Sequence, residues 1–379
     1  MPLAQRLSLV IFLGGGGRSP VEAMITTARG AAALDSIEAA LSSDAFGAAI
    51  LATDDPSGQA YPPRLELDID DGPFHFGRRL AGVIQRHRLA SVVYIGGGSM
   101  PLLGSEGLSQ IACAIESATA LTNNRFSSDL AAFPVTAQVL AAIEGVDRDN
   151  ALARALSEKA GLVVDELPRT LEMQMDIDAP SDLAVLKLTQ QGGPRLREYL
   201  SALDVDLHRY RKALRLFTDR TAQIVVAGRV GSHSWQYLER ETACRVRLFA
   251  EERGLESDAR VLTGTARSLL GFFIEAAGVD RLFEVLPALG DAAFMDTRVL
   301  LAHMRIEATR EDRFHSDLGA WPEIADPFLR DFTRASVEAR IPVLLGGHSL
   351  MSGGLMALNE FAWRQHEARQ SNNPTSPSS

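Results

Sequence analysis

The sequence predicts an α/β protein in two parts: an N-terminal domain with a mainly parallel sheet, followed by a predominantly α-helical domain. Strand and helix patterns alternate through the first half of the chain, whereas helical patterns dominate the second half. The 379 residues exceed the length of one typical domain. The hydrophobic content of 46% supplies enough side chains for two packed cores.

In the first half, strands separated by helices predict a largely parallel sheet that helices cover on both faces. Ligands bind at the carboxyl ends of the strands in sheets of this kind. We expect strands at 7–13, 48–52, 64–69, 91–95 and 131–133, with helices at 28–41, 76–88 and 105–121.

The segment Gln190-Gln191-Gly192-Gly193-Pro194 separates the halves, because it combines polar residues with two glycines and a proline. We therefore expect domains at 1–190 and 195–368, and a disordered polar tail at 369–379. In the second domain we expect two short strands, at 223–227 and 341–345. Its other elements are predicted to be helices, at 195–216, 235–252, 266–277, 280–286, 292–304, 327–339 and 355–366.

Composition narrows the choice of partners and compartment. The net charge of −10 argues against nucleic acid and against an anionic membrane as the main partner. Cys113 and Cys244 lie in separate predicted helices, do not indicate a disulfide framework and fit a reducing cytoplasm. The apolar stretch near residues 7–13 is too short for a signal peptide and runs into glycines. No apolar run approaches the roughly 20 residues that a membrane span needs.

The most informative motif follows the first predicted strand. There, Leu13 leads into four glycines and then Arg18; we call Gly14, Gly15, Gly16 and Gly17 the glycine loop. Glycines at a strand end let the backbone approach a ligand closely, and successive N–H groups can hold phosphates. Tight turns after a first strand are common in α/β domains, so this motif is informative only together with two later segments.

The first of these segments, the serine turn, is Gly97-Gly98-Ser99-Met100-Pro101. The second, the aspartate segment, is Met175-Asp176-Ile177-Asp178-Ala179-Pro180-Ser181-Asp182-Leu183. Together with the glycine loop, in this order and spacing, they resemble the nucleotidyltransferases of the molybdenum-cofactor guanylyltransferase type. The phosphoenolpyruvate and phospholactate guanylyltransferases are relatives in that group. The resemblance covers residues 7–187, about half of the chain.

The resemblance implies a Rossmann-like (GT-A-like) nucleotidyltransferase fold for the N-terminal domain. It implies that the glycine loop and Arg18 hold the nucleotide phosphates, with Gly97, Gly98 and Ser99 beside them. In the family, the aspartate of a Gly-Gly-Asp-Met-Pro turn binds the metal ion. A later segment supplies another metal-facing position, here Asp176, which we expect to be catalytic. Mg²⁺ is the implied cofactor, and a nucleotide and a small-molecule acceptor are the implied partners.

Two departures from the family pattern bear on activity. The family loop usually continues to an arginine and then a lysine, whereas here only Arg18 follows. Ser99 stands where the metal-binding aspartate is expected, and a hydroxyl is a poorer ligand than a carboxylate for a hard divalent cation. Either another carboxylate substitutes, with Asp129 and Asp176 as candidates, or this half has lost catalysis and retains binding.

The aspartate segment has a structural interpretation beside the functional one. Asp178, Pro180 and Asp182 also form a good helix start, with Asp178 as the N-cap, proline in the first turn and Asp182 favouring the helix dipole. We expect Asp178 to cap the helix and Asp176 to face a ligand.

Two further groups are candidates for substrate contacts. The polar segment at 122–129 forms either a hydrogen-bonded turn or a substrate loop. In the second case Asn124 contacts the nucleotide, Arg125 an anion, and Asp129 a metal or a hydroxyl. After Phe74-His75-Phe76-Gly77, either Arg78 or Arg79 can replace the missing lysine, and the other is a solvated helix residue.

One pattern occurs twice in the second half: a predicted strand is followed by a loop of glycine, histidine and serine, and then by a helix. These loops are residues 228–234 (the Gly228 loop) and 346–354 (the Gly346 loop), and they form either packing turns or anion sites. Serine and histidine pairs there permit nucleophilic chemistry, but no Gly-x-Ser-x-Gly motif is present. Asp296 and Arg298, on one predicted helix, do not share a face and are expected to be solvated. No histidine shows zinc-type spacing.

The function expected from these observations is transfer of a nucleotidyl group from an NTP to a small phosphorylated or carboxylated acceptor. The alternative is a non-catalytic protein that binds a nucleotide or sugar nucleotide. Ser99 favours this alternative, and the aspartate segment favours the enzyme. A third interpretation places the activity in the helical domain. The sequence leaves the base, the acceptor and the oligomeric state open.

Overall fold

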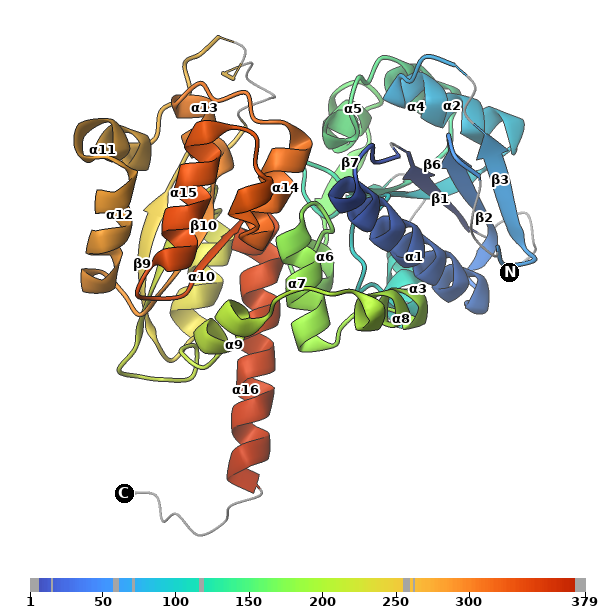
Figure 1. Cartoon of the computed structure of the whole chain (residues 1–379). Helices are drawn as coiled ribbons and strands as arrows, with labels where there is room; N and C mark the ends of the chain where they lie inside the picture. Colours follow the sequence, from blue (N-terminus) through green and yellow to red (C-terminus); the bar gives the residue numbers. More distant parts are fainter. Residues whose placement is uncertain are drawn as a thin grey trace. The chain divides into compact units, whose positions relative to one another are not determined.

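A computed structural model describes residues 7–14, 16–56, 61–69, 72–115, 119–254, 260–261 and 263–371 (Figure 1). The chain divides into two compact units. The first unit comprises Met1–Gly17, Thr26–Ile177 and Gly192–Tyr199, and the second comprises Arg18–Ile25, Asp178–Gln191 and Leu200–Ser379. The domain limits expected from the sequence stay a prediction, and residues 372–379 of the expected tail lie outside the described residues.

The first unit is built on a seven-stranded mixed sheet with the order β3-β2-β1-β4-β6-β5-β7. All neighbouring strands are parallel except β6, which is antiparallel to both β4 and β5. Because β2 and β4 flank β1 on opposite sides, the strand order reverses at β1 and β4, where open α/β sheets bind ligands. The strands are β1 (Leu7–Leu13), β2 (Phe46–Thr53), β3 (Leu65–Ile69), β4 (Ser91–Gly96), β5 (Thr119–Thr122), β6 (Leu130–Pro134) and β7 (Val163–Glu166).

Helices cover both faces of this sheet, because each central strand directs apolar side chains to both sides. Val10 of β1 packs on one face, and its neighbours Leu9 and Ile11 pack on the other. Figure 1 shows α1 and α3 on one side and α2, α4 and α5 on the other. These helices are α1 (Pro20–Ser42), α2 (Phe76–Arg86), α3 (Ser105–Ala114), α4 (Ala137–Glu144) and α5 (Leu152–Glu158), followed by α6 (Leu171–Gln174) and α8 (Pro194–Ala202).

The second unit contains a four-stranded parallel sheet with the order β11-β10-β8-β9. Our expectation of two strands in a mainly helical domain is therefore corrected. The strands β9 (Arg245–Ala250) and β10 (Ala292–Asp296) occupy segments predicted as helices. All of β10 is buried, and a short continuous apolar run has no periodicity that separates a buried strand from a helix. The strands β8 (Gln223–Gly228) and β11 (Val343–Gly346) match the two predicted ones.

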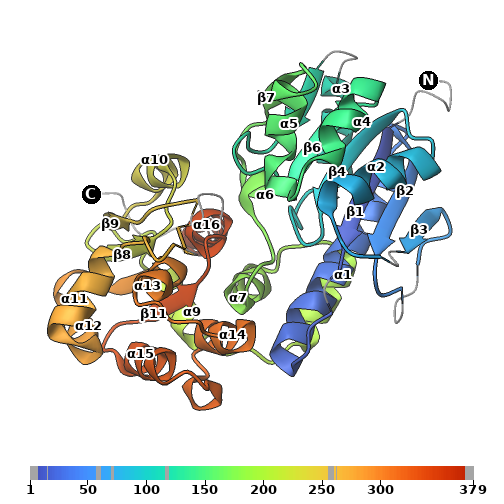
Figure 2. The same ribbon diagram turned by 90° about the horizontal axis from the view of Figure 1, so that it is seen from above.

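Helices again lie on both faces of the second sheet. One core joins α11, α12 and α15 to alternate residues of β8, β10 and β11. Figure 2 shows these helices on one side of the sheet, with α10 and α16 on the other. The helices of this unit are α7 (Pro180–Thr189), α9 (His208–Leu214), α10 (Ser232–Glu241), α11 (Leu269–Ala277), α12 (Val279–Val285), α13 (Arg298–His303), α14 (Arg310–Leu318), α15 (Pro327–Glu338) and α16 (Leu355–Ser371).

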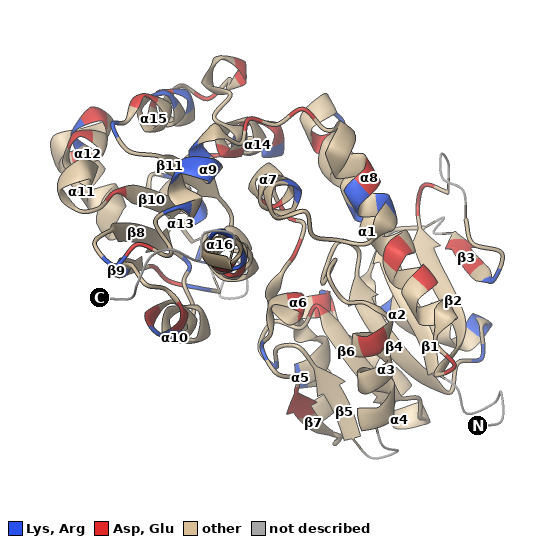
Figure 3. Cartoon of the chain, turned by 90° about the horizontal axis from the view of Figure 1, so that it is seen from below, with Lys and Arg blue, Asp and Glu red and all other residues tan. Residues whose placement is uncertain are grey.

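Charged residues of both signs are distributed over the helices (Figure 3). The charged residues of helix α9 are basic alone, namely Arg209, Arg211 and Lys212. Within the described part of the chain, no helix is long and apolar enough to cross a membrane.

Candidate functional site

The glycine loop follows β1 and leaves room beside its backbone. Gly14 and Gly16 are exposed. A Cβ atom on Gly16 would meet nothing within 4 Å, and one on Gly14 would lie 3.4 Å from Oδ1 of Asp54. Gly15 lies outside the described residues. The end of β1 therefore presents open backbone beside Gly16.

Backbone N–H groups at the start of α1 already have hydrogen-bond partners among the side chains of the same segment. The carboxylate of Glu22 accepts hydrogen bonds from the backbone N–H groups of Arg18 (2.8 Å) and Ser19 (3.3 Å). In return, the Ser19 hydroxyl accepts one from the Glu22 N–H (3.4 Å). This capping box occupies amides that could otherwise bind an anion. Arg18 itself is exposed, so its guanidinium is the part that remains available to a phosphate.

The glycines of the serine turn are required by packing. The N–H of Gly97 donates to the carbonyl of Phe12 (2.8 Å), and a Cβ on Gly97 would collide with that carbonyl. Gly98 has a φ of +96°, and a Cβ there would press on the side chain of Arg29. Arg29 in turn donates from Nε to the carbonyl of Ile177 (2.6 Å). Arg29 belongs to no motif, and sequence reasoning missed it.

The aspartate segment pairs directly with the serine turn. The N–H of Met100 donates to the carbonyl of Met175 (3.0 Å), and the N–H of Ile177 donates to the carbonyl of Gly98 (3.0 Å). Ser99 and Asp176 thus face each other in a short antiparallel bridge. Because Phe12 of β1 pairs with Gly96 of β4, the glycine loop leaves the same edge of the sheet. The three motifs named from the sequence meet where the strand order reverses.

Two further carboxylates lie around the end of β4. The carbonyl of Asp129 accepts from the N–H of Gly96 (2.9 Å), and its side chain accepts from Asn123 (3.3 Å). Asp149 accepts from the hydroxyl of Tyr94 (3.4 Å). Burial, then the nearby Asp149 and Asp129 charges, raise the pKa of Tyr94 well above its usual value. Asp149, which lies outside every motif, was not predicted.

These oxygen donors fit Mg²⁺ by their chemistry. A Cβ placed on Gly96 would lie 3.2 Å from Oγ of Ser99 and 3.7 Å from Oδ2 of Asp149, so both groups border the same strand end. Within the described part of the first unit, no three potential ligands converge within 4.8 Å. The residues therefore fit a Mg²⁺ ion that one or two carboxylates hold together with substrate phosphates, rather than a complete protein cage.

The other predicted contact residues are engaged locally. Asn124 accepts from the N–H of Phe126 (3.1 Å), which closes a turn. Arg125 donates to the carbonyl of Val164 on β7 (2.7 Å). Arg79 pairs with the buried Asp68 (2.6 Å), whereas Arg78 is exposed in the first turn of α2. Of the two arginines, Arg78 is the one whose side chain is accessible.

In the second unit, the strand ends carry buried ion pairs. Asp296, at the end of β10, pairs with Arg229 (2.5 Å), and Arg298 pairs with Asp317 (2.7 Å). Our expectation that Asp296 and Arg298 are solvated residues of one helix is wrong, because Asp296 ends a buried strand. Burial alone would raise the pKa of Asp296, but Arg229 and Arg298 outweigh it and lower that pKa.

The helix start at α7 also differs from the prediction. The carboxylate of Asp182, rather than Asp178, accepts from the N–H groups of Asp178 (2.9 Å) and Ala179 (2.8 Å). Asp182 is fully buried, and burial followed by the Asp178 charge raises its pKa to about 8. Among the described residues, Oδ1 of Asp182, Oγ of Ser181 and the hydroxyl of Tyr210 have no hydrogen-bond partner.

The side chain of Asp178, which does not cap the helix, lies beside the Gly346 loop. Oδ2 of Asp178 is 3.7 Å from Nδ1 of His348, and both side chains are about half exposed. Asp176 precedes Asp178 by two residues in the chain. Aspartate and histidine are ligands that transition-metal ions accept, so Asp178 and His348 form a candidate cation-binding pair within the second unit. Zinc-type spacing in the sequence did not reveal it, because its members are far apart in the chain.

No protein-family model matches this chain, and no curated protein matches it. Solved structures similar to it include a nucleotidyl transferase from Methanothermobacter thermautotrophicus, at 16% identity over 52% of this chain and 98% of that one, with a TM-score of 0.37. A homologue of Mycobacterium tuberculosis rv0371c from Mycobacterium sp. strain JC1 is 13% identical over 43% and 85%, with a TM-score of 0.30. A cytidylyltransferase from Leptospira borgpetersenii is 14% identical over 43% and 76%, with a TM-score of 0.31. These distant similarities assign the chain to no family.

Proposed function

We propose that this protein is a nucleotidyltransferase-like enzyme that joins a nucleotidyl group from an NTP to a small phosphorylated or carboxylated acceptor. The observation that carries the proposal is the meeting of the three motifs at the edge of the sheet where β1 and β4 end. Sheets of this topology bind ligands at that point. The glycine loop leaves open space there, and carboxylates border it.

In the proposed reaction, backbone N–H groups of the glycine loop and the Arg18 guanidinium hold the triphosphate. Asp176, which pairs with Ser99 through the backbone, and Asp149, near the end of β4, supply hard oxygen ligands. A Mg²⁺ ion bound there would neutralise charge on the phosphates. An acceptor oxygen attacks the α-phosphorus in line, a new P–O bond forms, and the bond to the β-phosphate breaks to release pyrophosphate. Orientation and charge stabilisation supply the catalysis.

Ser99 favours a second candidate, a protein that binds a nucleotide or sugar nucleotide without catalysis. The hydroxyl removes a charge that would hold the metal ion, which weakens transfer more than binding. The two candidates differ in one product, since only the enzyme releases pyrophosphate.

A pyrophosphate-release assay on the full chain separates them. Each NTP is offered with Mg²⁺ and a panel of phosphorylated and carboxylated hydroxy acids, after a thermal-shift screen has selected the base. We expect release that Asp176→Asn reduces at least tenfold, whereas Asp165→Asn, at an exposed position on β7, leaves it unchanged. Ser99→Asp should increase release and its dependence on Mg²⁺. Nucleotide binding without release in the natural protein and in Ser99→Asp would favour the binding protein.

A further inference from the structure

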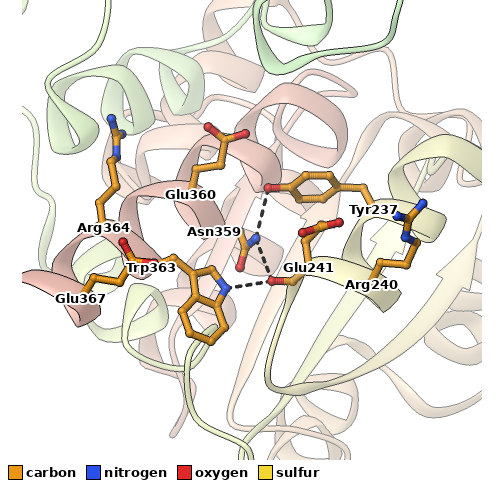
Figure 4. Close-up of a pocket in the computed structure, with 8 residues that line it drawn as sticks. All are labelled: Tyr237, Arg240, Glu241, Asn359, Glu360, Trp363, Arg364 and Glu367. Carbon is orange, nitrogen blue, oxygen red and sulfur yellow. Dashed lines mark hydrogen bonds between the residues drawn. The ribbon is translucent and has the colours of Figure 1, made fainter. Parts of the chain in front are cut away.

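A groove with a volume of about 560 Å³ lies in the second unit, between the C-terminal half of α10 and one face of α16 (Figure 4). It is remote in the chain from the three motifs of the proposed nucleotide site. Helix α16 contributes residues at helical spacing, so that they share a face: Asn359, Glu360, Trp363, Arg364 and Glu367. Helix α10 contributes Tyr237, Arg240 and Glu241.

Asn359 lines this groove and has a side-chain acceptor without a hydrogen-bond partner among the described residues. Its side chain is buried, with 1% of the residue exposed. Nδ2 donates to the hydroxyl of Tyr237 (3.1 Å) and to the carbonyl of Glu241 (3.2 Å). Because a carbonyl only accepts, the amide nitrogen must face Glu241, which fixes the orientation of the side chain. Oδ1 therefore points away and has no hydrogen-bond partner among the described residues. A buried acceptor of this kind is completed by a donor.

The aromatic residues of the groove are held in place. Nε1 of Trp363 donates to the carbonyl of Glu241 (2.8 Å), which orients the indole beside Asn359 (Figure 4). Burial raises the pKa of Tyr237 to about 12, so its hydroxyl keeps its proton at neutral pH. An indole that is fixed at the side of a groove offers a face to a cation.

The charged residues that line the groove also favour a cation. Three carboxylates border the groove, from Glu241, Glu360 and Glu367, against two arginines. Of the two arginines, Arg364 lies with its guanidinium over the ring of Phe361, 5.6 Å from the ring centre. The resulting excess of negative charge favours a cation and disfavours a phosphate or a carboxylate.

We propose that this groove binds a guanidinium or primary ammonium group. The cation lies against the Trp363 indole, donates an N–H to Oδ1 of Asn359 and pairs with the carboxylate of Glu367. The group is carried either by a small molecule or by an arginine or lysine side chain of a partner protein. This site differs from the proposed nucleotide site in its residues and in the charge of its ligand.

The test uses the full chain with Trp235→Phe and Trp321→Phe, so that Trp363 is the remaining fluorophore among three tryptophans. N-acetyl-arginine amide is titrated against N-acetyl-citrulline amide, which has the same shape without the charge. We expect a saturable change with the arginine probe and at least tenfold weaker binding of the citrulline probe. Glu367→Gln should weaken binding of the arginine probe at least threefold, and high salt should weaken that binding further. Glu284→Gln, an exposed residue of α12, is the matched control and should have no effect.

Asn359 also ties α10 to α16, so its substitution could unfold the protein; for this reason the exposed Glu367 carries the test. Agmatine and a Gly-Arg-Gly peptide distinguish the sources of the cation: tighter binding of agmatine indicates a small molecule, and tighter binding of the peptide indicates a partner protein. Equal binding of the arginine and citrulline probes, or no saturable change with either, would overturn the proposal. Sedimentation that shows a dimer whose dissociation alone exposes Trp363 would also overturn it.

Discussion

In the first unit the central strands β1 and β4 end in glycines, with carboxylates of Asp129, Asp149 and Asp176 around them. In the second unit β8 and β10 end at the same kind of strand-order reversal, but there the buried Asp296 pairs with Arg229, and the buried Asp317 pairs with Arg298. The same reversal of strand order is therefore surrounded by different groups in the two sheets. Buried aspartates that pair with arginines stabilise a fold, whereas open backbone at a strand end leaves room for a ligand.

The largest effect should come from breaking a buried pair in the second unit. Asp296→Ala leaves Arg229 without its counter-charge at a buried strand end and should lower the free energy of unfolding by about 3–5 kcal/mol. Asp176→Ala in the first unit should change it by only about 0.5 kcal/mol, because Asp176 is partly exposed and lies outside the hydrophobic cores. Denaturant unfolding monitored by circular dichroism measures both. Equal losses in the two variants would remove the distinction between the units.

A pair of glycine substitutions tests the same distinction within the first unit. Gly97→Ala forces a methyl group onto the carbonyl of Phe12 and should cost about 1–3 kcal/mol of stability. A Cβ atom on Gly16 would meet nothing within 4 Å, so the fold should tolerate Gly16→Val while the larger side chain obstructs a nucleotide. We expect an unchanged melting temperature and at least tenfold weaker nucleotide binding by calorimetry for Gly16→Val. Unchanged affinity would show that the glycine loop does not bind phosphate.

The sequence predicted the elements of the first sheet better than those of the second. Strands β1 and β4 were recognised because apolar runs end in glycine, which marks a strand end locally. Strand β10 was taken for a helix because its buried apolar run continues into the apolar residues of α13. Asp296 ends β10 and pairs with Arg229, 67 residues away in the chain, and no local pattern encodes that pair.

The same limit applies to the candidate site. The motifs could be recognised because glycine, proline and aspartate indicate turns and helix starts from the local sequence alone. Asp149 and Arg29 reach the site from elements without a motif, so only the folded chain identifies them. At α7, both Asp178 and Asp182 suit a helix start, and the buried position of Asp182 decides which one caps it.

The buried carboxyl of Asp182 predicts a pH effect that belongs to the second unit. Its pKa is about 8 in the folded protein, against a usual 3.8, so the folded state binds the extra proton between these values. Stability from this residue is therefore present below pH 4 and is lost as pH rises towards 8. Asp182→Asn keeps an oxygen for the helix cap but removes the titration. Unfolding at pH 5 and pH 8 should show a smaller loss of stability in the variant. An equal loss in both proteins would assign the pH dependence to other groups.

The smallest expected effect on stability is at the Gly346 loop, which we expect to face a ligand. His348→Ala removes a half-exposed pair with Asp178 and should change the free energy of unfolding by no more than about 0.5 kcal/mol. If the loop serves the reaction, the variant lowers activity or ligand binding at an unchanged melting temperature. A melting temperature lowered by several degrees with unchanged binding would make the loop a packing element, like the other strand ends of its unit.

The central claim is that the edge of the first sheet where β1 and β4 end binds a nucleotide. Isothermal titration calorimetry of the full chain with the NTP selected by thermal shift, in Mg²⁺ and in EDTA, tests it most directly. We predict binding to the natural protein that depends weakly on Mg²⁺, a larger Mg²⁺ dependence for Ser99→Asp, and at least tenfold weaker binding for Gly16→Val. Absence of NTP binding by the natural protein, or the same affinity for all three proteins in both buffers, would contradict it.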